Sequence, residues 1–272
     1  MRLFINALVL ATSLATTASA DQNSQLKTLQ TGDDNRGWEA VGRLDIDNKS
    51  MCTGALIAPD LVLTAAHCLY NKDTNQRFDA TKIKFMAGWR SGRATAYAQV
   101  KRAVVHPEYT FSGAAKNVNV RNDIAVLQLT RPIRKTSITP FATGARPRKG
   151  AAVGIVSYAH DRAQSPSIEE SCKVLARQSG TLILSCDVDF GSSGAPIFSM
   201  ENGQARIVSV VSAKAEVSGR KVSLGTSLQE PLSVILAKLK ETEGPFQKPN
   251  QVGRLLVSQG PLDRSGAKFL RP

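Results

Sequence analysis

The sequence predicts an all-β protein whose strands pair antiparallel in sandwiches or barrels. Three observations lead to this prediction: from Trp38 onward short apolar runs alternate with turn residues, their spacing is nearly regular, and no helical pattern separates them. Short strands without intervening helices are typical of antiparallel folds. Apolar residues make up 42% of the chain and charged residues 21%, which indicates a folded globular protein and excludes a disordered one.

The predicted strands form two series. The first series contains the apolar runs at residues 41–46, 54–57, 61–64, 82–86, 97–100, 104–105 and 124–129. A stretch rich in basic residues and proline follows at 145–150. The second series contains the runs at residues 152–156, 172–175, 181–184, 196–198, 206–211 and 224–227. Two series of comparable length predict two similar halves, which divide near residues 135–150.

One helix is predicted after the second series, over residues 231–240. Pro231 suits the first position of a helix, because its fixed φ is helical and its missing N–H is not needed there. The apolar side chains that follow lie on one helical face: Leu232, Ile235, Leu236 and Leu239. Residues 241–272 are rich in Gly, Pro, Gln and charge, and they are predicted to be a C-terminal tail.

The start of the chain differs in composition from the predicted strands. Arg2, a short apolar stretch and small residues at 18–20 are typical of a secretory signal peptide, so residues 1–20 are interpreted as one, cleaved before Asp21. A buried first helix is the alternative, but it explains the small residues poorly. Residues 21–36 are polar, and we expect an extended N-terminal segment or a short propeptide there.

The chain is basic, with 35 Lys and Arg against 22 Asp and Glu and a formal net charge of +13. No basic helical stripe and no row of aromatic side chains accompanies this charge, so nucleic-acid binding is not expected. A basic exported protein would instead attract anionic polymers or acidic proteins in a salt-dependent manner. No apolar run of about 18 residues follows the amino terminus, so no membrane span is expected.

Four cysteines lie beyond the predicted signal peptide: Cys52, Cys68, Cys172 and Cys186. An even number in an exported chain indicates disulfides, and four cysteines allow three pairings among which the sequence alone does not choose. Local pairing, Cys52 with Cys68 and Cys172 with Cys186, would close two loops of about 15 residues, each worth roughly 3 kcal/mol. A zinc site is not expected, because no C-x2-C pair is present.

Three residues have the chemistry to hydrolyse an amide. His67 ends a predicted strand, Asp123 immediately precedes one, and Ser193 lies in a glycine-flanked turn. Amide hydrolysis by a serine needs a nucleophile, a base that takes its proton and a group that orients the base. It also needs donors for the developing oxyanion, and Gly191 frees the backbone near Ser193 to offer its N–H.

Each of these residues alone is a weak signal. A single histidine at a strand end is more often structural or solvated, and an aspartate before a strand usually caps a turn. The order His67, Asp123, Ser193 in an all-β exported chain makes the three signals reinforce one another. The remaining histidines, His106 and His160, are interpreted as surface or loop residues.

The stretches around the three residues resemble the signatures of chymotrypsin/trypsin-like serine proteases. They read Thr64-Ala65-Ala66-His67-Cys68, Asn122-Asp123-Ile124-Ala125 and Gly191-Ser192-Ser193-Gly194-Ala195-Pro196. Their order along the chain also matches that family. The resemblance covers residues 38–240, and the segments at 33–36 and 187–196 look closer to bacterial glutamyl-endopeptidase-like members than to digestive trypsins.

The resemblance implies two six-stranded antiparallel β-barrels and a C-terminal helix, which together form a protease domain at residues 37–240. Barrel one would span residues 37–140, barrel two residues 150–229 and the helix residues 231–240. His67 and Asp123 would come from barrel one and Ser193 from barrel two, so that the triad lies in the cleft between them.

The same resemblance implies a role for each residue. Ser193 would attack the substrate carbonyl, His67 would act as general base and then acid, and Asp123 would orient the imidazole. The backbone N–H groups of Gly191 and Ser193 would form the oxyanion hole. A Cys52–Cys68 bridge would fix the turn that carries His67.

Three further residues are expected to contact the substrate. Ser212 lies on the stretch that resembles the substrate-binding strand of relatives, close to the catalytic aspartate. Lys214 stands where relatives usually have glycine, and it would narrow the pocket or attract an acidic side chain. Asp187 lies where trypsins keep their pocket acid, although a structural hydrogen-bonding role is the alternative.

The sequence departs from the family in the residues that govern activation and specificity. Ser192 stands where digestive relatives carry the acid that pairs with a newly cut amino terminus, and the start Ile-Val-Gly-Gly is not present. Residues 211–214 lack the histidine that glutamyl endopeptidases place beside the pocket. We therefore expect a site that forms without that terminal ion pair.

These features predict a secreted or periplasmic serine endopeptidase that cleaves proteins or peptides through an acyl-enzyme intermediate. We expect a monomer that needs no metal and no cofactor. The alternative is a catalytically silent protease-like protein whose basic surface holds an anionic partner. A missing triad residue would favour the alternative, and none is missing.

Overall fold

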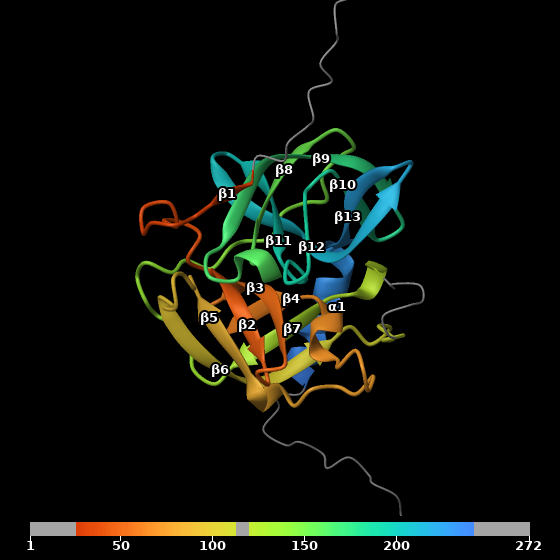
Figure 1. The fold of residues 1–272 in the computed structure, drawn as a ribbon. Coiled ribbons are helices and arrows are strands. Elements are labelled where there is room, and N and C mark those ends of the chain that lie inside the picture. The colour runs from red at the N-terminus through yellow and green to blue at the C-terminus, as the bar shows by residue number, and fades with distance from the viewer. Residues whose placement is uncertain (1–25, 113–119, 242–272) are drawn as a thin grey trace, which may run out of the picture.

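The strands form two closed six-stranded antiparallel β-barrels followed by one C-terminal helix, which confirms the predicted fold class (Figure 1). The computed structural model describes residues 26–112 and 120–241. The predicted signal peptide at 1–20 and the predicted tail beyond residue 241 lie outside these ranges.

Barrel one contains β2 Val41–Ile46, β3 Ser50–Ala58, β4 Leu61–Thr64, β5 Ile83–Ala87, β6 Ala96–Val105 and β7 Ala125–Leu129. The strands close in the order β2-β3-β4-β7-β6-β5. Successive side chains of a strand point to opposite faces. In β2 the apolar residues Leu44 and Ile46 are therefore buried inside the barrel, whereas Arg43 and Asp45 face outward.

Barrel two contains β8 Ala152–Ser157, β9 Ser167–Gln178, β10 Thr181–Leu184, β11 Pro196–Glu201, β12 Gln204–Val217 and β13 Arg220–Ser227. It closes because β8 pairs with β9 on one side and with β11 on the other. Its core contains the disulfide-bonded Cys172 and Cys186 together with Ile155, Leu182 and Val211.

The segment before residue 37, which the sequence placed outside the domain, packs against barrel two. Strand β1 (Lys27–Thr28) pairs with β9, and the backbone N–H of Leu29 donates to the Pro166 carbonyl at 2.8 Å. Leu29 is buried because its side chain joins the apolar core. The folded unit therefore includes residues on the amino-terminal side of Gly37.

Strand β6 is one strand where the sequence predicted two runs. Its register with β7 shifts between Val100 and Arg102, so polar residues interrupt the apolar pattern without ending the strand. Arg102 pairs with Gln128 of β7 in the sheet, and its Nε also donates to the Gln128 side chain at 2.6 Å.

Helix α1 (Gln229–Glu241) follows barrel two but packs against β6 and β7 of barrel one (Figure 1). Leu232, Ile235 and Leu239 are buried along one face, which is the face the sequence predicted. The Arg102 guanidinium donates to the carbonyl of Leu239 at 3.1 Å. The helix thereby ties the end of barrel two to barrel one.

Aromatic side chains fill part of the junction between the barrels. Trp38, which precedes β2, lies 5.0 Å from the ring of Phe198 on β11 and 5.9 Å from the ring of Phe141 in the connection between the barrels. Such offset and edge-on contacts add to the free energy of burial. A continuous apolar core therefore holds the two barrels in a fixed relation.

Candidate active site

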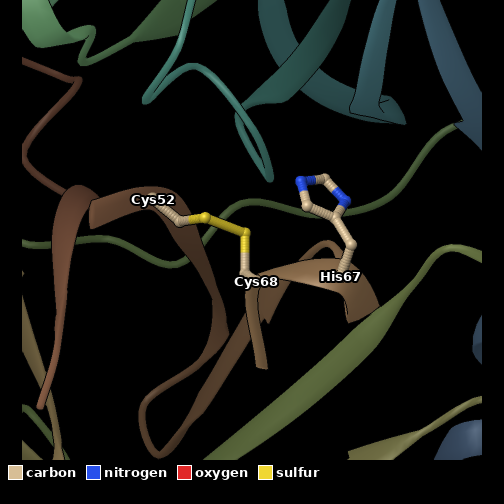
Figure 2. Close-up of side chains that lie close together, drawn as sticks. All are labelled: Cys52, His67 and Cys68. Carbon is tan, nitrogen blue, oxygen red and sulfur yellow. A yellow bond between two sulfur atoms is a disulfide. The ribbon is translucent and has the colours of Figure 1, made fainter. Parts of the chain in front are cut away.

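His67 lies on a short 3-10 helix, η1 (Ala66–Leu69), directly after β4. The Cys52–Cys68 disulfide ties this helix to β3, and Figure 2 shows the imidazole projecting from the same helix as the bridge. Potential ligand atoms of Cys52, Cys68 and His67 lie within 4.8 Å of one another. Because the two sulfurs are bonded to each other, neither is the thiolate that a metal requires.

Asp123 follows the short helix η3 (Val120–Asn122), and its side chain is fully buried. Its Oδ1 accepts the backbone N–H of His67 at 2.8 Å, and its Oδ2 lies 2.7 Å from His67 Nδ1. The Ser212 hydroxyl donates to Oδ2 as well. A proton on Nδ1 therefore points at the carboxylate, which leaves Nε2 free to accept a proton.

Ser193 lies between two glycines whose backbones are left-handed, Gly191 at φ +98° and Gly194 at φ +78°. A Cβ on Gly191 would lie 3.0 Å from Ala159 Cα, and one on Gly194 would collide with the Thr53 carbonyl and the Thr64 hydroxyl. Only glycine fits both positions without strain. Ser193 on this turn and His67 on η1 line the same two cavities.

Within the described part of the chain no hydrogen bond joins the Ser193 hydroxyl to the His67 ring. Such contacts between nucleophile and base are often long in unliganded enzymes and shorten when substrate binds.

The backbone on the amino-terminal side of Ser193 offers two free donors. The Phe190 carbonyl accepts the His160 N–H at 2.7 Å, and because a trans peptide is planar, the N–H of Gly191 points the opposite way. The Gly191 carbonyl is held by the Thr53 hydroxyl at 2.9 Å. Among the residues in ranges 26–112 and 120–241, no acceptor binds the N–H of Gly191 or of Ser193.

Ser192 is fully buried and takes part in a small network of hydroxyl and backbone groups. Its N–H donates to the Asp189 carbonyl at 2.9 Å, and its hydroxyl lies 3.3 Å from that of Ser157 on β8. The N–H of Asp189 donates to the Ser192 hydroxyl at 3.4 Å. Neutral groups therefore hold the turn at the position where digestive relatives use a charged acid.

A cavity of about 310 Å³ adjoins Ser193 along the edge of β12, and we call it the strand-edge cavity. Ser212 and Lys214, two of the three residues that the sequence predicts to contact the substrate, line it. Lys214 Nζ lies 2.8 Å from Asp189 Oδ1 and 4.4 Å from the centre of the Phe190 ring. The hydrogen bond from Lys214, and a second from the Phe190 N–H, lower the pKa of Asp189.

Asp187, by contrast, is exposed and does not line the strand-edge cavity. Its backbone N–H donates to the buried carboxylate of Glu169 at 2.8 Å. Burial is the main cause that raises the pKa of Glu169, and the hydrogen bond from Asp187 opposes it. The acidic residue that lines the strand-edge cavity is Asp189, two residues further on, which was not predicted from the sequence. No local signal distinguished Asp189 or Glu169 from the exposed acids beside them.

His106 was interpreted as a surface or loop residue; it lies in the loop directly after β6, but it is buried and not on the surface. Its Nδ1 accepts the N–H of Glu108 at 3.2 Å, and burial lowers the pKa of His106. The nearby Tyr109 lines the strand-edge cavity, where burial and the charge of Asp123 raise its pKa. His160 is exposed, as expected, but it also lines the second cavity.

The family model described as trypsin matches residues 30–229. Cathepsin G of Mus musculus is 38% identical over 94 residues, which cover 34% of this chain and 31% of that protein. Serine protease 23 of Homo sapiens is 30% identical over 164 residues, which cover 54% of this chain and 42% of that protein. Glutamyl endopeptidase of Bacillus licheniformis is 25% identical over 169 residues, which cover 62% of this chain and 51% of that protein. The chain thus spans about half or less of the length of these relatives.

A solved structure of Glu endopeptidase in complex with MPD superposes on this chain with a TM-score of 0.65 at 20% identity. The superposition covers 79% of this chain and 96% of that chain, and at this identity it concerns the fold alone. Because the family model matches well over half of the sequence and both barrels are present, this chain belongs to the family of chymotrypsin/trypsin-like serine proteases.

Proposed function

We propose that this protein is a serine endopeptidase that hydrolyses peptide bonds with Ser193 as nucleophile. One observation carries the proposal: His67, oriented by Asp123, lines the same cavities as Ser193, beside two backbone N–H groups that lack acceptors in the described ranges. A nucleophile, an oriented base and preorganised donors are the parts that acyl transfer requires.

In the first half of the reaction Ser193 Oγ would attack the substrate carbonyl carbon while His67 Nε2 takes its proton. The carbonyl oxygen would gain negative charge, which the N–H groups of Gly191 and Ser193 would stabilise. One such donor is typically worth about 3–4 kcal/mol in the transition state. The imidazolium would then donate its proton to the leaving amine, the C–N bond would break, and an ester on Ser193 would remain.

In the second half a water molecule would attack the ester. His67 would take the water's proton, and the same two N–H groups would again stabilise the oxyanion. Return of the proton to Ser193 Oγ releases the acid product and restores the enzyme. Asp123 acts throughout by orienting the imidazole, for which its two hydrogen bonds from His67 are suited.

We propose further that the substrate residues before the scissile bond lie along Ser212–Lys214 at the edge of β12. An extended peptide that adds to a strand edge gains main-chain hydrogen bonds. Lys214 and Asp189 face this cavity as a pair, so a substrate side chain that enters must accommodate both charges.

We propose that the protein is exported. Its two disulfides persist in oxidising compartments. Residues 1–20 would be the removed signal peptide, and the mature chain would begin at Asp21. In the part of the chain that the structure describes, no helix is both long and apolar enough to cross a membrane. Amino-terminal sequencing of the exported protein tests this start.

The experiment that tests catalysis compares the native protein with Ser193→Ala in cleavage of a peptide library and in labelling by a fluorophosphonate. We expect the native protein to cleave and to be labelled on Ser193, and Ser193→Ala to lose at least about 10³-fold in rate. Ser233→Ala is the matched control, because Ser233 is an exposed serine on α1 whose hydroxyl donates to the nearby Glu230 carbonyl. A native protein that neither cleaves nor is labelled would instead support the catalytically silent alternative.

A further inference from the structure

A second cavity, of about 490 Å³, adjoins Ser193 and His67 on the side of the Cys52–Cys68 bridge, and we call it the disulfide cavity. Its charged lining is unbalanced. Arg43, Lys49 and Lys72 face it, against the single carboxylate of Asp45. An excess of cationic groups around one cavity creates a positive potential that attracts anionic groups.

Two of these cations lack an anionic partner. Lys49 is paired with Asp47 at 2.8 Å. The Arg43 guanidinium instead lies 5.6 Å from the centre of the Trp89 ring, and its Nε is buried without a hydrogen bond. Lys72 Nζ lies 5.5 Å from the centre of the Phe190 ring, and Lys72 lies at the border of the two cavities, since it also lines the strand-edge cavity. In the described ranges of the chain no carboxylate forms an ion pair with Arg43 or with Lys72.

The direction of the substrate determines which half of a peptide meets this cavity. If the residues before the scissile bond lie along β12, in the strand-edge cavity, the residues after the bond extend to the opposite side of Ser193. That side is the disulfide cavity, which the Gly191 backbone and the bridge also line. This step rests on the proposed function.

We propose that the disulfide cavity is a binding site for an acidic side chain located within the first three residues after the scissile bond. Arg43 and Lys72 provide the charge, and Arg43 has donors that match a carboxylate in geometry. The Arg43 side chain is already stacked on Trp89, so less conformational entropy is lost when it binds. The substrate class is therefore peptides that carry Glu or Asp on the leaving side.

The test uses a peptide that the native protein cleaves at one bond, synthesised with Glu, Gln or Lys at each of the three positions after that bond. At one position or more we expect kcat/KM for Glu to exceed that for Gln by at least about threefold, with Lys disfavoured, as for partly exposed ion pairs. The preference should shrink when ionic strength rises from about 0.05 M to about 0.5 M, because salt screens it.

The variants Lys72→Gln and Arg43→Gln test whether these two residues cause the preference for Glu over Gln. Each should reduce the ratio of kcat/KM for the Glu peptide to kcat/KM for the Gln peptide. Because Arg43 packs against Trp89, Arg43→Lys is included, and it should keep part of the ratio if the charge matters. Lys101→Gln is the control, since Lys101 is an exposed cation on β6 that lines neither cavity.

Equal rates for Glu and Gln at every position would overturn this inference and leave the proposed function intact. A preference for Glu that survives unchanged in both Gln variants would overturn the assignment to Arg43 and Lys72. Absence of cleavage of all peptides, together with absence of fluorophosphonate labelling, would remove the proposed function and this inference with it.

Discussion

The carboxylate of Asp123 accepts hydrogen bonds from both barrels. His67 of barrel one donates two, and Ser212 on β12 of barrel two donates the third. A group that orients the base must itself be held, because a small rotation of the imidazole moves Nε2 away from the nucleophile. At the scale of single residues, the candidate site therefore depends on how the donors around Asp123 are arranged.

Asp123→Asn should lower kcat by about 10³–10⁴-fold with little change in KM. The amide would donate to Nδ1 and would favour the tautomer in which Nε2 carries the proton and cannot accept one. Steady-state kinetics on a single peptide measure both constants. Asp73→Asn, an exposed loop substitution, serves as control. A loss of less than tenfold in kcat would show that the imidazole does not need this orientation.

Gly194→Ala should destabilise the fold by at least about 2 kcal/mol, because a Cβ there collides with the Thr53 carbonyl in addition to requiring a left-handed backbone. Gly203→Ala is the matched control. Gly203 has a similar φ of +77°, but nothing lies within 4 Å of its Cβ position. Urea unfolding of both variants separates the collision from the backbone cost. If both variants lose the same unfolding free energy, the turn around Gly194 relaxes to accommodate the new methyl group.

At the scale of elements, the turn that carries Ser193 is held by its neighbours from both barrels. Thr53 on β3 binds the Ser193 and Gly191 carbonyls, and the Ser192 hydroxyl meets Ser157 on β8. His160 fixes the Phe190 carbonyl. None of these contacts involves a chain terminus, so the turn has its anchors without a newly cut amino group.

We therefore predict that activity does not require an amino terminus made by one specific cut. Chains that begin at Asp21, at Gln22 and with one extra residue before Asp21 should cleave one peptide at comparable rates. A start position with activity about 100-fold above the others, equivalent to roughly 2.7 kcal/mol, would instead identify a zymogen.

Apolar patterning located every strand of the two barrels but not the length of each. Residues 61–64 and 181–184 were predicted with their observed bounds, because a two-residue turn directly precedes each run. Strands β9 and β12 extend well beyond their apolar runs into residues with exposed side chains. Backbone hydrogen bonds to a neighbouring strand hold these extensions in place. The pattern of apolar side chains does not predict such backbone pairing.

Sequence motifs marked residues that the structure brings close together, but they gave no signal for residues that are placed by tertiary packing alone. The structure brings His67, Asp123 and Ser212 into one hydrogen-bonded group and places Lys214 in the strand-edge cavity. Asp187 differs because its backbone N–H, in the loop after β10, donates to the carboxylate of Glu169, which lies eighteen positions earlier on β9. The partner of a buried carboxylate depends on which loops meet in space, and sequence spacing does not encode that.

At the scale of the whole molecule, the stability of the fold should depend on pH through Glu169. Burial raises the pKa of this carboxyl above its ordinary value of 4.5. As pH rises, Glu169 loses its proton first in the unfolded chain. In the folded chain it keeps the proton to higher pH, because losing it would create a buried negative charge. The stability that Glu169 contributes is thus present below its ordinary pKa and is lost as pH rises through the raised one.

Glu169→Gln should therefore gain stability relative to the native protein as pH is raised from about 4 to about 7. The amide oxygen can still accept the Asp187 N–H, so the hydrogen bond is retained. Urea unfolding at both pH values measures the difference. Glu170→Gln is the control, because Glu170 is the exposed neighbour on β9. If the difference in unfolding free energy between the native protein and Glu169→Gln does not change with pH, the raised pKa of Glu169 is contradicted.

Helix α1 is the last described element to leave the ribosome, yet it packs against the barrel that is synthesised first. Barrel one therefore emerges with the apolar surface of β6 and β7 uncovered, and this surface stays uncovered until translation has passed residue 241. A chain that stops early leaves His67 and Asp123 on an unfinished barrel and has no complete partner for them. The order of synthesis thus delays assembly of the candidate active site until both barrels and helix α1 have been made.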